Sequence, residues 1–82
     1  MMENTQYYKD MNSIENGMIT KIIRKEYGKM ILEYMTNHDQ VWKSIYYHHP
    51  RSREHYFMER QDVLQEMSEE EAINIMKQWN QL

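Results

Sequence analysis

The sequence predicts an α+β fold: a short N-terminal helix, an antiparallel meander of three to four strands, and a capped C-terminal helix that packs on one face of the sheet. Three observations support this prediction. Apolar and charged side chains match across turns in the middle of the chain, a helix-capping motif precedes the last segment, and a helical stripe of apolar residues occupies the first. The alternative is a small all-helical bundle with breaks near Gly17, Asn37, Pro50 and Ser68.

The size and composition of the chain limit the classes of protein to consider. Its 82 residues predict one small domain, residues 1–82, with a thin core. The absence of cysteine excludes disulfide bonds and thiolate zinc sites. No apolar run approaches the roughly 20 residues that span a bilayer, and the first ten residues lack the basic and apolar regions of a signal peptide. We therefore expect a cytoplasmic protein without a membrane segment.

The first predicted element is a short helix over residues 5–16. Apolar side chains there recur at offsets i, i+1, i+4 and i+7, which is typical of one helix face. They are Tyr7, Tyr8, Met11 and Ile14. Asn16 and Gly17 follow as a left-handed stop signal. Such a stripe needs a surface to pack on, either the core of the same domain or a second copy of the chain, so a homodimer is one alternative.

Residues 18–36 favour a β-hairpin over a helix. In the hairpin, Gly28 takes the left-handed position of a three-residue loop, and Ile22 lies opposite Leu32. A helix over the same residues would hold Gly28 in its interior, at a cost of about 1 kcal/mol. The hairpin is therefore the preferred interpretation.

A second turn at residues 36–40 extends this ladder into a meander, with strands at about 18–25, 29–36, 41–49 and 54–60. One face of the predicted sheet then carries a row of charges formed by Lys21, Glu33 and Lys43. The other face is apolar and consists of Ile22, Met30, Leu32, Tyr34, Trp42, Tyr46 and Phe57. Complementary pairs across strands are typical of a real sheet.

Residues 45–58, IYYHHPRSREHYFM, are nearly symmetric and predict the last hairpin of the meander. A turn at residues 50–53 would place His48 opposite His55. Two imidazoles at that spacing can bind zinc or nickel, but a stable site needs a third or fourth ligand, and strand alternation points His49 to the opposite face. A His-based metal module is therefore an alternative, and we predict no metal or other cofactor.

The tip of this hairpin is basic. Arg51 and Arg53 lie there, and Lys43 lies nearby among tyrosines. Basic residues interleaved with aromatic ones bind single-stranded nucleic acid in many proteins. Here Glu54 and Glu59 interrupt the patch, and the acidic C-terminal third repels phosphate. Direct binding of nucleic acid through this hairpin is thus a disfavoured alternative.

The last predicted element is a helix over residues 69–81. Ser68 and Glu71 have the spacing of a capping box, and Met67 and Ala72 fit the accompanying hydrophobic staple. Glutamates in the first turn complement the helix dipole. An apolar stripe should cover the sheet and consists of Ala72, Ile75, Met76, Trp79 and Leu82.

Charge is segregated along the chain. Residues 56–82 carry two Lys or Arg against six Asp or Glu, whereas residues 1–55 are close to neutral. No P-loop, nucleophile elbow or glycine-rich phosphate cradle is present, so we predict a protein that is not an enzyme. We interpret it as a protein-interaction module, a small acidic inhibitor or adaptor that occludes a basic, nucleic-acid-binding site on a larger protein. The predicted contact residues are Glu66, Glu69, Glu70 and Glu71, with Arg51 and Arg53 as further candidates.

Overall fold

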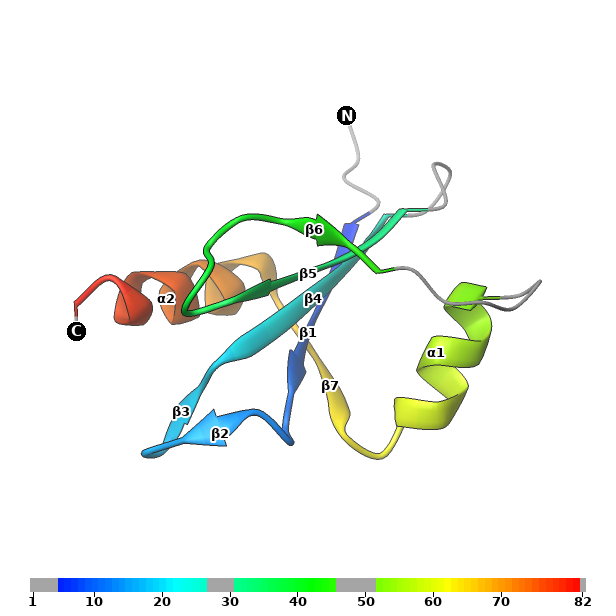
Figure 1. Ribbon diagram of the computed structural model, residues 1–82, viewed down its shortest axis with the longest axis horizontal. Helices are drawn as coiled ribbons and strands as arrows, with labels where there is room; N and C mark the ends of the chain where they lie inside the picture. Colours follow the sequence, from blue (N-terminus) through cyan, green and yellow to red (C-terminus); the bar gives the residue numbers. More distant parts are fainter. Residues whose placement is uncertain (1–4, 27–30, 46–51, 82) are drawn as a thin grey trace.

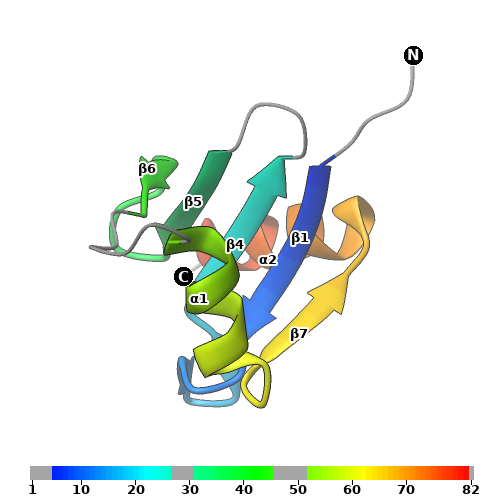
Figure 2. The same ribbon diagram turned by 90° about the vertical axis from the view of Figure 1, so that its right-hand side faces the viewer.

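The computed structural model describes residues 5–26, 31–45 and 52–81, and it confirms the α+β class. A five-stranded antiparallel sheet has the strand order β6-β5-β4-β1-β7. Its strands are β1 (Thr5–Asp10), β4 (Lys21–Glu26), β5 (Ile31–Thr36), β6 (Lys43–Ser44) and β7 (Leu64–Met67). Helix α1 (Ser52–Arg60) covers one face of the sheet, and helix α2 (Glu69–Trp79) covers the other (Figure 1, Figure 2).

The N-terminal segment is a strand, so the predicted helix over residues 5–16 is wrong. β1 pairs with β4 on one side and with β7 on the other, which places it inside the sheet. Tyr7 packs on the α2 side and Tyr8 on the α1 side. A strand that is covered on both faces carries apolar residues at consecutive positions. The consecutive tyrosines fitted the spacing of a helix face for this reason, although they belong to a strand with two covered faces.

A small hairpin, β2 (Ile14–Glu15) and β3 (Met18–Ile19), follows β1 and projects beyond the main sheet (Figure 1). Asn16 and Gly17 form its turn with φ values of 55° and 78°. Two consecutive left-handed residues are what a tight two-residue hairpin turn requires. The left-handed signal was read correctly, but here it joins two strands and does not end a helix.

The predicted hairpin of β4 and β5 is confirmed, but its register differs by three residues from the predicted one. Ile22 lies opposite Met35, and Ile23 lies opposite Tyr34. Because three is an odd number, the shift places Ile22 and Leu32 on opposite faces, Ile22 toward α2 and Leu32 toward α1. The single apolar face predicted from the sequence is therefore wrong, because both faces of this sheet are apolar.

The predicted charge row across the strands is wrong for the same reason. Glu33 lies opposite Arg24, whose Nε and Nη2 atoms both lie 2.7 Å from its Oε1 atom. The guanidinium of Arg24 also lies over the ring of Trp42, 4.3 Å from its centroid. Lys43 forms an ion pair with Asp39 in the loop between β5 and β6. Glu33 and Lys43 thus each have a local partner of opposite charge.

The predicted last hairpin, with strands at 41–49 and 54–60, is also wrong. β6 spans only Lys43–Ser44, and residues 52–60 form helix α1. Tyr56 and Phe57 of this helix pack against the sheet face that carries Ile23 and Leu32. That second apolar face explains why the segment is helical, since a helix can cover it and another edge strand cannot. Residues 46–51 lie outside the described part of the chain.

After α1 the chain returns as β7, a strand that the sequence analysis missed. β7 pairs with β1, with Tyr7 opposite Met67 and Tyr8 opposite Glu66. Its side chains alternate between the two faces: Leu64 packs on the α1 side, and Met67 packs on the α2 side. At four residues it is too short for a strong period-two pattern.

The C-terminal helix is confirmed. Ala72, Ile75 and Trp79 are buried against the sheet, as the predicted stripe requires, and Met67 belongs to the same cluster. The indole Nε1 atom of Trp79 donates a hydrogen bond to the carbonyl oxygen of Ile19, at 2.7 Å. α2 is thereby attached both to the sheet and to the β2–β3 hairpin.

Replacing Trp79 by Phe should lower the free energy of unfolding by about 1–3 kcal/mol, because the Ile19 carbonyl loses its donor and the smaller ring leaves space in the core. Urea denaturation measures this. The matched control is Ile73→Val, at an exposed position of the same helix, which should change stability by less than about 0.5 kcal/mol. Equal denaturation midpoints for Trp79→Phe and wild type would contradict the structural role of this bond.

Tyr56 gives the fold a dependence on alkaline pH. Burial raises the pKa of its phenol above the ordinary value of 10.0, and the nearby Arg60 opposes part of the shift. As the pH rises through about 10, the unfolded chain loses this proton before the folded protein does, so stability falls. We expect the loss of stability between about pH 9 and pH 11 to be smaller in Tyr56→Phe than in wild type. Equal losses in chemical denaturation would refute this.

Candidate protein-interaction surface

The four glutamates predicted to contact a partner gather where β7 ends and α2 begins. Glu66 lies in β7, and Glu69, Glu70 and Glu71 form the first turn of α2. β7 is the outermost strand on its side of the sheet, and α2 runs from its end across the rear face in Figure 2. We call these four residues the acidic β7–α2 surface.

Two carboxylates of this surface hold α2 against the sheet. Glu71 accepts a hydrogen bond from the Nζ atom of Lys9 at 2.5 Å, and Glu69 accepts one from the hydroxyl of Tyr7 at 3.3 Å. Both donors belong to β1. The backbone amide of Glu71 donates to the Oγ atom of Ser68 at 3.1 Å, which confirms the predicted N-cap. These bonds fix the direction of the first helical turn.

The other two carboxylates are available to a partner. Glu66 and Glu70 are exposed, and neither forms a hydrogen bond or ion pair with another of the residues that the structure describes. Exposed, unpaired charges contribute little to the stability of a fold. Glu66 and Glu70 instead contribute a negative electrostatic potential outside the protein, near the start of α2.

Of the two arginines predicted as further contact residues, one belongs to a described element. Arg53 lies in α1, and Arg51 is outside the described residues. The prediction of a hairpin that would present both is wrong, because its second strand, residues 54–60, is part of helix α1. Lys43, the third basic candidate, is held by Asp39, whose hydrogen bond and charge raise the pKa of Lys43.

The proposed pair of His48 and His55 also loses its geometric basis. His55 lies in α1 and not in a strand, so it has no cross-strand neighbour. His48 and His49 fall outside the described residues. Within the described ranges, no group of three or more His, Asp or Glu side chains is arranged to hold a metal ion.

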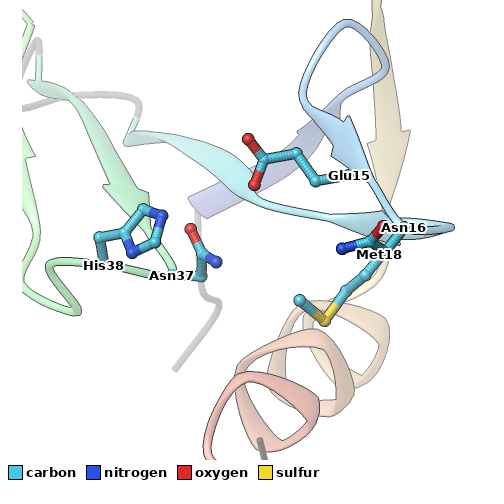
Figure 3. A pocket seen from close by; sticks show the side chains of 5 residues that line it. All are labelled: Glu15, Asn16, Met18, Asn37 and His38. Atoms are coloured by element: carbon cyan, nitrogen blue, oxygen red, sulfur yellow. The ribbon is translucent and has the colours of Figure 1, made fainter.

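A pocket that the sequence analysis missed lies between the β2–β3 hairpin and the segment after β5 (Figure 3). Its volume is about 320 Å³. It is lined by Glu15, Asn16, Met18, Asn37 and His38. The backbone amide of Asn37 donates to the carbonyl of Thr20 at 3.1 Å, which holds the two walls together. The sequence shows a turn signal at Asn16 and Gly17 and another after β5, but only the folded topology brings these two turns side by side.

No family model, curated protein or solved structure matches this chain. In the part of the chain that the structure describes, no helix is both long enough and apolar enough to cross a membrane. The charge and geometry of the acidic β7–α2 surface therefore carry the functional inference.

The hydroxyl of Ser68 supports the acidic β7–α2 surface as the N-cap of α2. Ser68→Ala should lower the free energy of unfolding by about 1 kcal/mol, because the amide of Glu71 loses its acceptor. Thermal unfolding measures this. Ser68→Asp keeps an acceptor oxygen and should retain most of the stability. An alanine variant as stable as wild type would show that the cap contributes nothing.

Proposed function

We propose that this protein is a non-enzymatic interaction module that binds a basic surface of a larger protein through its acidic β7–α2 surface. The observation that carries the proposal is the pair of exposed carboxylates, Glu66 and Glu70, which no other described residue neutralises. Net charge supports it, since the chain carries −3 overall and the acidic excess lies in its C-terminal third. Complementary charge raises association rates and selects partners.

The surface is preorganised for such an encounter. Lys9 and Tyr7 of β1 hold Glu71 and Glu69, and Ser68 caps the helix on which three of the four glutamates lie. A partner that contacts Glu66 and Glu70 therefore meets carboxylates on rigid backbone, which lowers the entropy that binding must overcome. Lysine or arginine side chains are the partner groups that suit them.

Occlusion is the mode of action that this surface suits best. The Lys and Arg side chains of a nucleic-acid-binding site neutralise phosphates, and carboxylates at the same positions compete for them. A small domain that covers such a site would act as an inhibitor or adaptor. The proposed partner is thus a larger protein with a basic, phosphate-binding surface, located in the cytoplasm.

The test is quantitative affinity capture from the native host with wild type and the double variant Glu66→Lys/Glu70→Lys. We expect wild-type binding to weaken as NaCl rises from about 0.05 M to 0.5 M, because screening shortens the range of the interaction. The double variant should lose at least about tenfold in affinity for the captured partner.

The matched control is Glu15→Lys, a charge reversal at an exposed glutamate on β2, away from the acidic β7–α2 surface. It should retain affinity within about threefold if the local surface matters and not the net charge alone. Capture that resists high salt, or that is equal for wild type and the double variant, would overturn the proposal.

A further inference from the structure

The outer edge of β7 exposes backbone hydrogen-bonding groups in a defined pattern. Just before β7, the amide of Met11 donates to the carbonyl of Val63 at 2.7 Å. The β1–β7 register continues that pairing, with Lys9 opposite Gln65 and Tyr7 opposite Met67. In an antiparallel ladder, alternate residues direct both their N–H and C=O groups to the same neighbour. Gln65 and Met67 therefore face β1, and Leu64 and Glu66 face away from it. At Val63 only the carbonyl faces β1, because its N–H donates to the carbonyl of Arg60 at 2.9 Å.

Leu64 and Glu66 thus present two N–H and two C=O groups along the free edge. β7 is the terminal strand of the five-stranded sheet, and no other described strand pairs with this edge. It contains no proline that would block pairing. An open row of such groups is a template for another strand. The opposite edge, β6, spans only two residues and offers a shorter template.

We propose that β7 is a docking edge, to which a basic, extended segment of the partner adds as a sixth strand. This inference rests on the proposed function and specifies how the partner is held. Main-chain hydrogen bonds to Leu64 and Glu66 would supply affinity, and the flanking side chains would supply specificity, as in other cases of strand addition.

Charge identifies the occupant. A strand added to β7 lies beside Glu66 and close to the first turn of α2, where Glu69 and Glu70 are exposed. Lysine or arginine in the added strand would complement these carboxylates. A second copy of this chain would instead bring two sets of the same glutamates together, and like charges on adjacent strands are destabilising.

The two outward-facing positions also predict a sequence preference. Leu64 and Glu66 are two residues apart, so their side chains lie on the same face of β7, the α1 face. Leu64 is half-buried against the cluster around Tyr56. The added strand should therefore place an apolar residue beside Leu64 and a basic residue beside Glu66, two positions apart.

The probe is an eight-residue peptide, TVTKTVTK, which places valine and lysine alternately on one strand face. Its binding to the full chain is measured by titration calorimetry, and amide hydrogen exchange is followed by NMR. In the free protein, the amides of Gln65 and Met67 should exchange slowly and those of Leu64 and Glu66 quickly. On adding the peptide, we expect exchange at Leu64 and Glu66 to slow by at least about tenfold.

Two controls separate strand addition from simple charge attraction. The same peptide methylated on alternate backbone nitrogens keeps its lysines but cannot form the edge ladder, and its affinity should fall roughly tenfold or more. In the protein, Glu66→Pro removes an outward-facing donor, which an edge strand tolerates, whereas Glu66→Gln removes only the charge. We expect the proline variant to bind the peptide more weakly than the glutamine variant.

The outcomes distinguish this inference from the proposed function. Equal affinity for the methylated and unmethylated peptides, or binding without protection of Leu64 and Glu66, would overturn strand addition and leave salt-sensitive capture through Glu66 and Glu70 standing. Failure of the peptide to bind would also overturn it. Sedimentation that shows a dimer, with those two amides protected in the absence of peptide, would assign the edge to a second copy and refute a basic partner strand.

Discussion

The constraint on which the rest of this structure depends is burial on both faces of the central sheet. Ile22 and Ile23 are neighbours in β4, point to opposite faces, and are both 0% exposed. A strand with two such residues needs a cover on each side, because each buried isoleucine contributes on the order of 1.5–3 kcal/mol only when water is excluded. The two helices supply those covers, and their placement fixes the route of the chain around the sheet.

Elements with local signals were predictable from the sequence. Ser68 and Glu71 define the start of α2 through contacts within four residues, and the stripe of Ala72, Ile75 and Trp79 follows one helix face. The left-handed backbone at Asn16 and Gly17 was also predicted, because few residues fit it, although it was expected to end a helix and instead joins two strands. In each case the deciding interaction lies between residues close together in the sequence.

The errors share one physical origin, an assumed sheet with a single apolar face. Tyr7 and Tyr8 were assigned to one face, so β1 was predicted as a helix. Ile22 and Leu32 were also assigned to one face, which displaced the predicted β4–β5 register by three residues. A sheet with one apolar face needs only one covering helix, so α1 was not predicted. Of the predicted site, the four glutamates lie in β7 and the first turn of α2, where their nearness in sequence places them. The open edge of β7 depends on pairing with β1, which no local pattern reveals.

The position of β1 within the sheet has a consequence for the synthesis of this protein. β1 is synthesised well before β7, which is one of its two neighbours in the sheet. The bonds that attach α2 to the sheet and hairpin join residues 60 to 62 positions apart. Such long-range contacts close slowly, because the intervening chain must lose entropy before they form. The sheet face that carries Ile22, Met35 and Met67 therefore stays exposed until α2 has been made, and exposed apolar surface of this kind favours aggregation.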